Sequence, residues 1–256
     1  MPVDANDPHN SCGDLPMPAD MAERWRIFLV KPEMRVEEDS CPEIFEHPTL
    51  FPLQRRRELE AMIRMARSIR PRVVMEVGCD KGSGFYHWLK CLPSVVGAIA
   101  CEIRGVPYLD LFAEAFPGVK LLGVEKSSLL ETTRDEIAAW LGAAKLDVLF
   151  IDGSKACVER DYQLYGPMVR TGGLIFIHDV NPSHVRHGVA PAAKFFAELV
   201  APGGKGLIVD TTELDNVPGA LHQTAYDVWL RFWGPDSCGV GWVVQPGPPA
   251  GTDQVE

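Results

Sequence analysis

Apolar and polar positions along this chain follow two alternating patterns. Short runs rich in valine and isoleucine are typical of strands, and between them apolar residues recur three or four positions apart, as in helices. The strands are expected at residues 72–77, 95–102, 119–124, 146–151, 174–178, 206–211 and 240–245. The helices are expected at residues 53–70, 84–92, 106–116, 131–141, 158–169, 189–200 and 220–231. Strands that alternate with helices of this length predict an α/β fold with a doubly wound, Rossmann-like sheet.

The last predicted strand differs from the others. It is rich in glycine, with Gly239 and Gly241 at its start. Such a terminal strand suits an antiparallel pairing, whereas the earlier strands are joined by helical crossovers that need parallel pairing. We therefore expect a seven-stranded, mostly parallel sheet with an antiparallel last strand and helices on both faces.

Four parts of the chain differ in composition. Residues 1–20 are rich in proline, aspartate and asparagine and are expected to form a flexible N-terminal tail. Residues 21–52 hold many apolar residues without regular periodicity, which indicates an irregular segment that either forms a lid or packs on the main domain. A dimer contact is a further alternative, and the wall residues of a lid would be Trp25, Phe28, Phe45 and Phe51. Residues 53–246 are expected to form the main domain, and residues 247–256 a flexible tail.

The formal net charge of −10 and the pI near 5.2 argue against a large nucleic-acid surface, because phosphate binding needs clustered lysine and arginine. The 7 cysteines show no C-x-x-C spacing, and reduced thiols in a cytoplasmic protein are the expected state. The first residues lack the apolar core of a secretory signal, and no apolar stretch is long enough to span a membrane. We expect a cytoplasmic protein without nucleic-acid or membrane partners.

The segment with the clearest functional signal is the sequence E-V-G-C-D-K-G-S-G at residues 76–84, directly after the first predicted strand. Glycines let the backbone approach a ligand closely, and the start of the following helix offers free N–H groups. The dinucleotide pattern G-x-G-x-x-G would need glycine at Asp80 and Ser83. The segment therefore predicts a ligand-binding turn of another kind.

Polar residues follow the next two predicted strands. Glu102 ends the second, where a carboxylate can accept both ribose hydroxyls of a nucleoside cofactor; helix capping is the alternative. Glu125 and Ser127 follow the third strand and are candidates for the adenine edge, although acids are also common in surface loops. Ligands bind beyond the carboxyl ends of the strands in open α/β sheets, so these side chains are expected near the glycine loop.

Strands four and five end in a second constellation. Asp152 follows one buried strand, and His178 and Asp179 follow the other. Two carboxylates with an imidazole suit a divalent ion, and mostly oxygen ligation favours Mg²⁺ or another hard ion over zinc. Acids at strand ends also cap helices, but the pairing of two such acids predicts a metal site at Asp152, His178 and Asp179.

These motifs resemble a known family. The loop at residues 76–84 is similar to the E-x-G-x-G-x-G loop of class I S-adenosylmethionine-dependent methyltransferases, with Asp80 in place of the middle glycine. Residues 147–179 resemble the cephalosporin-hydroxylase-like and macrolide-sugar O-methyltransferases, and the match extends over roughly residues 50–245. In those relatives an aspartate after strand four and an acidic pair after strand five hold a metal, so His178 is a departure.

The resemblance implies roles for individual residues. S-adenosylmethionine would be bound by the loop and strand-end residues, namely Glu76, Gly78, Asp80, Gly82, Ser83, Glu102, Glu125, Ser127 and Asp152. Asp152 and Lys155 form an Asp-x-x-Lys pattern similar to the catechol and caffeoyl-CoA O-methyltransferases, in which the lysine is the proposed general base. An exposed lysine in an ion pair is the alternative for Lys155, and His184 and His187 are alternative bases.

The resulting hypothesis is a methyltransferase that transfers a methyl group to a hydroxyl of a small molecule, such as a sugar, a phenol or a secondary metabolite, with help from a divalent metal. A metal-independent methyltransferase, in which Asp152 and Asp179 orient the substrate directly, is one alternative. A non-catalytic cofactor-binding or scaffold domain is another, and a homo-oligomer is left open.

Overall fold

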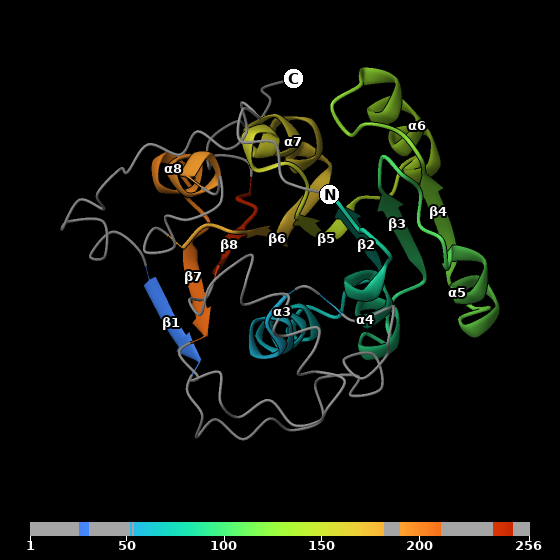
Figure 1. Cartoon of the computed structure of the whole chain (residues 1–256), viewed down its shortest axis with the longest axis horizontal. Helices are drawn as coiled ribbons and strands as arrows, with labels where there is room; N and C mark the ends of the chain where they lie inside the picture. The colour runs from blue at the N-terminus through green and yellow to red at the C-terminus, as the bar shows by residue number, and fades with distance from the viewer. Residues whose placement is uncertain (1–25, 31–51, 53, 182–189, 211–237, 248–256) are drawn as a thin grey trace, which may run out of the picture.

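The computed structural model describes residues 26–30, 52, 54–181, 190–210 and 238–247. Its strands are β1 Arg26–Val30, β2 Val73–Val77, β3 Gly97–Cys101, β4 Lys120–Val124, β5 Leu146–Ile151, β6 Val169–His178, β7 Lys205–Asp210 and β8 Val240–Val244. They form one 8-stranded sheet in the order β1-β7-β8-β6-β5-β2-β3-β4 (Figure 1). Strand β8 pairs antiparallel with both β6 and β7, and the other pairings are parallel. The expected Rossmann-like sheet with an antiparallel last strand is confirmed.

Strand β1 adds an edge that the sequence pattern did not predict. Its 5 residues pair in parallel with β7, in a part of the chain expected to be irregular. The expectation for residues 21–52 is therefore wrong at these positions, because a single apolar run between prolines shows no periodicity from which a strand could be recognised. Apart from residues 26–30 and 52, this segment lies outside the described residues, as does the helix expected at residues 220–231.

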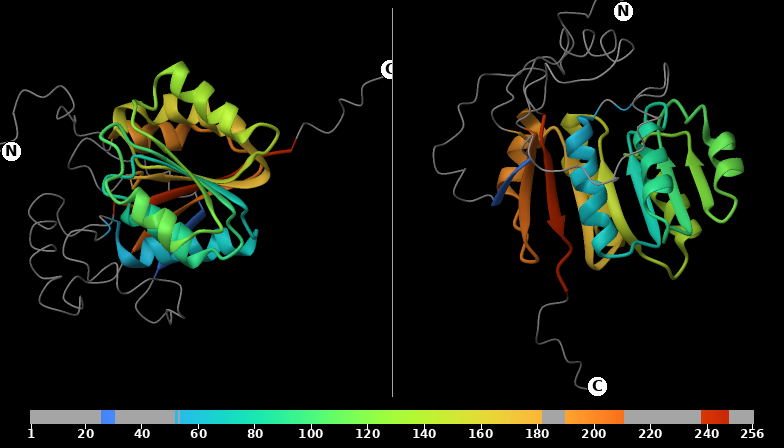
Figure 2. Two further views of the ribbon diagram at one scale, coloured as in Figure 1. Left: turned by 90° about the vertical axis from the view of Figure 1, so that its right-hand side faces the viewer. Right: turned by 90° about the horizontal axis from the view of Figure 1, so that it is seen from below.

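Helices cover both faces of the sheet, as expected (Figure 2). On one face lie α3 Arg56–Ser68, α4 Ser83–Cys91 and α5 Leu109–Ala115. On the other lie α6 Glu131–Leu141, α7 Val158–Tyr165 and α8 Ala190–Glu198. Among the described residues, no helix is long and apolar enough to cross a lipid bilayer.

The central strands carry apolar side chains on both faces because each strand contributes to two cores. In β5, Val148 and Phe150 pack with the layer of α3 and α4, whereas Leu149 and Ile151 pack with the layer of α7 and α8. All four side chains are 0% exposed. Alternation of side chains across a parallel sheet that is covered on both faces explains this pattern and fixes which face each helix covers.

Two neighbouring predicted boundaries are wrong, namely the end of the helix expected at residues 158–169 and the start of the strand expected at residues 174–178. The helix expected at residues 158–169 ends at Tyr165, and a 3-10 turn over Gly166–Met168 leads directly into the 10-residue strand β6. Pro167 lies in that turn and has no N–H group with which to continue the helix. The apolar spacing continues through the turn, which is why periodicity alone placed the helix end too late.

The fold places a switch in chain direction between β2 and β5. From β2 the chain proceeds outward through β3 and β4, and then returns to β5 on the other side of β2. The two strand ends are tied together, because the backbone N–H of Asp152 donates to Val77 O at 2.8 Å. Ligands of doubly wound sheets bind at such a point, beyond the carboxyl ends of the strands.

Asp147 joins the opposite ends of the same strands. Its Oδ2 accepts the backbone N–H groups of Arg72 and Val73 at 2.7 and 2.8 Å, and its Oδ1 pairs with the Nε of Arg170. Asp147→Ala should lower the free energy of unfolding by about 1–2 kcal/mol, because it removes the acceptor of three partly buried hydrogen bonds. Urea unfolding measures this loss. Asp135→Ala, at a side chain that is 65% exposed, is the control; an equal loss in both variants would contradict the prediction.

Candidate active site

A cavity of about 230 Å³ lies at the carboxyl ends of β2, β5 and β6. It brings together residues from five separate parts of the chain. They are Gln54, Glu76, Gly78, Cys79, Asp80, Ser83, Gly84, Asp152, Gly153, Lys155, His178, Asp179 and Cys238. The loop after β2 and the strand-end acids of β5 and β6, which the sequence pointed to separately, therefore line one site.

The loop after β2 turns tightly enough that most side chains could not be accommodated. Gly78 has φ +82°, and a Cβ at this position would lie 2.5 Å from the backbone N of Gly153. Gly82 has φ +91° and lies directly before the first residue of α4. Asp80 adopts φ +47°, a left-handed conformation that aspartate tolerates better than most residues. The replacement of the middle glycine by Asp80 is therefore compatible with the turn.

Glu76 is the buried acid of this loop. It is 1% exposed, and its Oε2 accepts the indole N–H of Trp88 at 2.9 Å. Burial raises the pKa of Glu76 well above its ordinary value, and the nearby charge of Asp152 adds to this effect. A Cβ on Gly84 would lie 2.8 Å from Glu76 Oε1, so helix α4 can start against this carboxyl only with glycine there.

Glu102 connects the glycine loop to the end of β3 but does not line the cavity. Its Oε2 accepts the backbone N–H of Asp80 at 3.0 Å, and its Oε1 accepts the backbone N–H of Arg104 at 3.2 Å. The Arg104 side chain pairs with Asp80 at 2.9 Å and with Glu102 at 3.5 Å. Glu102 does not cap a helix in this arrangement, since both N–H groups that it accepts lie in loops, and its predicted contact with ribose stays a prediction.

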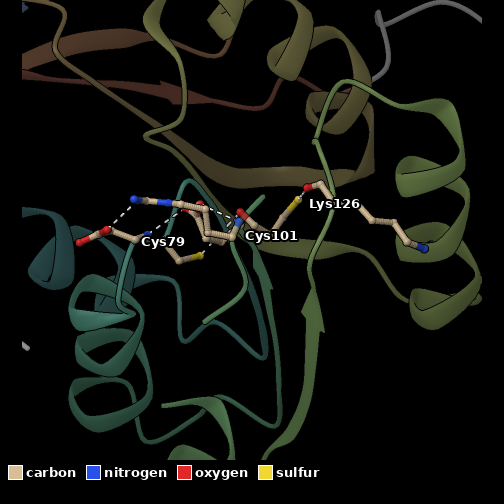
Figure 3. Close-up of polar contacts among 6 residues, drawn as sticks. Cys79, Cys101 and Lys126 are labelled. Atoms are coloured by element: carbon tan, nitrogen blue, oxygen red, sulfur yellow. Dashed lines mark hydrogen bonds and ion pairs between the residues drawn. The ribbon is translucent and has the colours of Figure 1, made fainter. Parts of the chain in front are cut away.

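Two thiols lie beside this connection. Figure 3 shows Cys101 between Cys79 and Lys126, with Cys79 on the glycine loop. The Sγ of Cys79 is 3.3 Å from Glu76 O, and the Sγ of Cys101 is 3.9 Å from Lys126 O. Burial raises the pKa of Cys79 well above its ordinary value and that of Cys101 to about 12. Both are therefore packing residues rather than nucleophiles.

The charged centre of the cavity consists of Asp152, Lys155, His178 and Asp179. Lys155 Nζ lies 2.6 Å from Asp152 Oδ1 and 2.7 Å from Asp179 Oδ2, so its ammonium bridges the two carboxylates. His178 Nδ1 lies 3.2 Å from both Asp152 Oδ1 and Asp179 Oδ1, although neither contact is an aligned hydrogen bond. An ion pair of Lys155 is therefore present, but the lysine is 18% exposed rather than on the surface as that alternative had it.

These four groups stabilise one another in their charged forms. Burial alone would lower the pKa of Lys155 and His178, but the carboxylates of Asp152 and Asp179 outweigh it, so both pKa values lie above their ordinary values. Burial would likewise raise the pKa of Asp152 and Asp179, but the two cationic groups hold both below their usual range.

Gln54 is a site residue that the sequence did not indicate. It lies just before α3, is 9% exposed, and donates from Nε2 to Asp152 Oδ2 at 2.5 Å. Its Oε1 is buried without a hydrogen-bond partner among the described residues. Because the two residues are 98 positions apart, no local pattern could have connected them.

Other predicted residues lie away from the cavity or outside the described part. Glu125 packs against Gly105, and the Oγ of Ser127 accepts the backbone N–H of Leu129 at 3.3 Å. Neither lines the cavity, and their predicted contact with adenine stays a prediction. His184 and His187 lie outside the described residues.

Asp161 is a buried acid behind the cavity wall. It is 1% exposed, and a Cβ on Gly153 would lie 3.6 Å from its Oδ2. Neither carboxylate oxygen has an aligned hydrogen-bond partner among the described residues. Burial raises the pKa of Asp161 to about 6. The polar side chain of Ser128 and the positive charge of Lys155 lower this pKa, but by less than burial raises it.

Asp161→Asn should therefore stabilise the protein above pH 6. The native state holds this proton up to about pH 6, whereas the unfolded state loses it near pH 4, so stability falls as the pH rises between these values. At about pH 8 the variant should gain about 2 kcal/mol, with no gain below about pH 4. Urea unfolding at both pH values measures this difference, and equal stability of the two proteins near pH 8 would contradict it.

Comparison with known proteins agrees with this geometry. Residues 75–180 match the family model described as a methyltransferase domain. The fold is similar to the O-methyltransferase TomG from Streptomyces achromogenes, involved in tomaymycin synthesis and solved with S-adenosylmethionine, at 17% identity over 82% of this chain and 91% of TomG, with a TM-score of 0.51. It is also similar to a protein from Staphylococcus aureus provisionally assigned as a caffeoyl-CoA O-methyltransferase, at 14% identity over 76% of this chain and 85% of that chain, with a TM-score of 0.50. No curated protein matches the sequence.

Residues 75–180 therefore match a methyltransferase domain, and the fold of the described residues agrees with the resemblance to class I S-adenosylmethionine-dependent methyltransferases. The sequence resemblance to this class is confirmed.

Proposed function

We propose that this protein transfers the methyl group of S-adenosylmethionine to a hydroxyl oxygen of a small molecule. The observation that carries the proposal is the convergence of the Asp152, Lys155, His178 and Asp179 side chains directly beside the methyltransferase glycine loop. A charged cluster at this position can orient an acceptor hydroxyl and accept its proton, whereas the methyl donor supplies the electrophile.

The loop residues are suited to hold the cofactor. Gly78 lets the backbone approach a ligand without a side chain, and Ser83 places the N-terminus of α4 at the cavity. Glu102, beyond the cavity rim, would accept the two ribose hydroxyls, as an acid at the end of the second strand does in related folds. We assign the methionine end of the cofactor to the side of the cavity lined by Glu76 and Asp152.

Asp152, His178 and Asp179 have the composition of a site for a divalent ion. One ligand atom from each lies within 4.8 Å of the others, and two of the three are carboxylate oxygens, which Mg²⁺ prefers. When bound, such an ion would supply Lewis acidity and lower the pKa of an acceptor hydroxyl. The acceptor itself would then be oriented by residues that line the cavity.

Lys155 is the residue placed to receive the proton of the acceptor. It lies in the cavity, and its side chain is 18% exposed. To act as a base it must first leave the two carboxylates, which at present hold its proton. His184 and His187, which follow β6 in the sequence and lie outside the described residues, remain alternative bases.

A metal-independent transfer is the second candidate. The bridge formed by Lys155 favours it, because the carboxylates already have a cationic partner. In that case Asp152 and Asp179 would orient the acceptor directly. Activity that persists after exhaustive chelation would support this candidate over the metal-assisted one.

Titration calorimetry tests the proposal. S-adenosylmethionine and its demethylated product, S-adenosylhomocysteine, are titrated into metal-stripped protein and again with Mg²⁺ present. We expect micromolar binding of either nucleoside, followed by methyl transfer to a panel of sugar and phenolic hydroxyls. Failure of both nucleosides to bind would overturn the proposal in favour of a non-catalytic scaffold.

A further inference from the structure

All four oxygens of the carboxylate pair formed by Asp152 and Asp179 face nitrogen atoms of this chain. Lys155 Nζ takes one oxygen from each, at 2.6 and 2.7 Å, and His178 Nδ1 lies 3.2 Å from one oxygen of each. The remaining oxygen, Asp152 Oδ2, accepts Gln54 Nε2. Each oxygen of the two carboxylates therefore already has a nitrogen atom of this chain as its neighbour.

The bridge by Lys155 occupies the position that a cation would take. A metal held by both aspartates needs an oxygen from each, and the ammonium of Lys155 binds one oxygen from each. A divalent ion that took these oxygens would lie close to the ammonium of Lys155, and the two positive charges would repel each other strongly in a buried site. The side chains of Asp152 and Asp179 are each only 12% exposed, so solvent screens that repulsion little.

We propose that Lys155 is the resident cation of this carboxylate pair, and that a divalent metal binds only by displacing its ammonium group. The metal's catalytic role rests on the proposed function, but the competition itself is a property of these side chains. Displacement would release the ammonium of Lys155 from the two carboxylates into the cavity that it already lines. Binding of the metal and release of the lysine would therefore occur together. The site then has two states, one closed by lysine and one loaded with metal.

Mn²⁺ titration followed by electron paramagnetic resonance tests this competition, because free Mn²⁺ gives a signal that is lost on binding. Lys155→Met, which keeps most of the unbranched side chain without its charge, should bind Mn²⁺ at least roughly tenfold more tightly than the wild type. Lys155→Gln, which keeps an N–H donor, should also bind more tightly than the wild type. Lys90→Met, at an exposed lysine, changes the net charge equally and should not alter Mn²⁺ affinity.

Adding Asp152→Asn to Lys155→Met should remove the gain, which would place the metal at this pair. Equal or weaker Mn²⁺ binding by both Lys155 variants would overturn the inference, provided that circular dichroism shows them folded. If neither variant folds, acylation of Lys155 in the wild type is followed by mass spectrometry. Faster labelling of the Mn²⁺-loaded protein supports displacement, and unchanged labelling overturns it.

Binding of S-adenosylhomocysteine is measured in the same preparations by calorimetry. Loss of nucleoside binding by the wild type would overturn the proposed function but leave the metal titration interpretable. Conversely, normal nucleoside binding without tighter Mn²⁺ binding in the variants would overturn only the competition between Lys155 and metal.

Discussion

Asp152→Asn is expected to reduce the rate of methyl transfer by roughly a thousandfold or more, the range typical of losing a group that acts on proton transfer and charge in the reacting site. Asp152 pairs with Lys155 and His178 and accepts from Gln54, so the amide would disturb every member of the charged centre. Cofactor affinity should change by less than about tenfold, because one altered hydrogen bond is worth only about 1 kcal/mol. Steady-state kinetics and calorimetry together measure both quantities.

The comparison of these two losses is the decisive part of the Asp152 experiment. Asp135→Asn, at an exposed aspartate on α6, is the control and should leave both quantities unchanged. If turnover and cofactor affinity fell by the same large factor, Asp152 would be a cofactor ligand alone, and its role in the acceptor site would be wrong. Thermal melting shows whether the variant is folded before either measurement is interpreted.

Glu102→Ala is expected to weaken binding of S-adenosylmethionine by roughly a hundredfold, since two charge-assisted hydrogen bonds to ribose would be lost. The same change removes the acceptor for the backbone N–H of Asp80, which holds the glycine loop. At saturating cofactor the turnover number should change only a few-fold, because Glu102 does not line the charged centre. Calorimetry with S-adenosylhomocysteine and saturation kinetics test this separation.

Glu114→Ala, at an exposed glutamate on α5, is the matched control for Glu102→Ala and should bind the cofactor like the wild type. The alternative for Glu102 is a purely structural role, in which it only caps the two loops. In that case Glu102→Ala would lower the melting temperature without changing the affinity for S-adenosylhomocysteine, and the ribose contact would be ruled out.

Much of the fold follows from patterns that are local in the sequence. The run Val148–Ile151 in β5 is apolar throughout because both faces of a parallel sheet are covered, and this pattern is visible without a structure. The turn at residues 76–84 is likewise local, because Gly78 and Gly82 adopt backbone conformations that few other residues accept. The convergence of Asp152 and Asp179 could be predicted because parallel strands end at the same edge.

Other features depended on contacts that no local pattern encodes. Strand β1 exists through its pairing with β7, more than 170 residues later, and its own short apolar run is ambiguous. Gln54 reaches Asp152 only because α3 begins at the cavity. The burial of Asp161 behind Gly153 depends equally on how α7 packs on the sheet.

The sequence by itself determined the class of fold, the glycine turn and the acids at the strand ends, because these depend on the period of apolar residues and on the conformations open to single residues. Only the tertiary structure decided how the charged side chains pair. Lys155 could have faced solvent, but packing brings its ammonium between Asp152 and Asp179, where Coulomb attraction in a buried site holds it. Such pairing depends on distances between strands, which the order of residues along the chain does not specify.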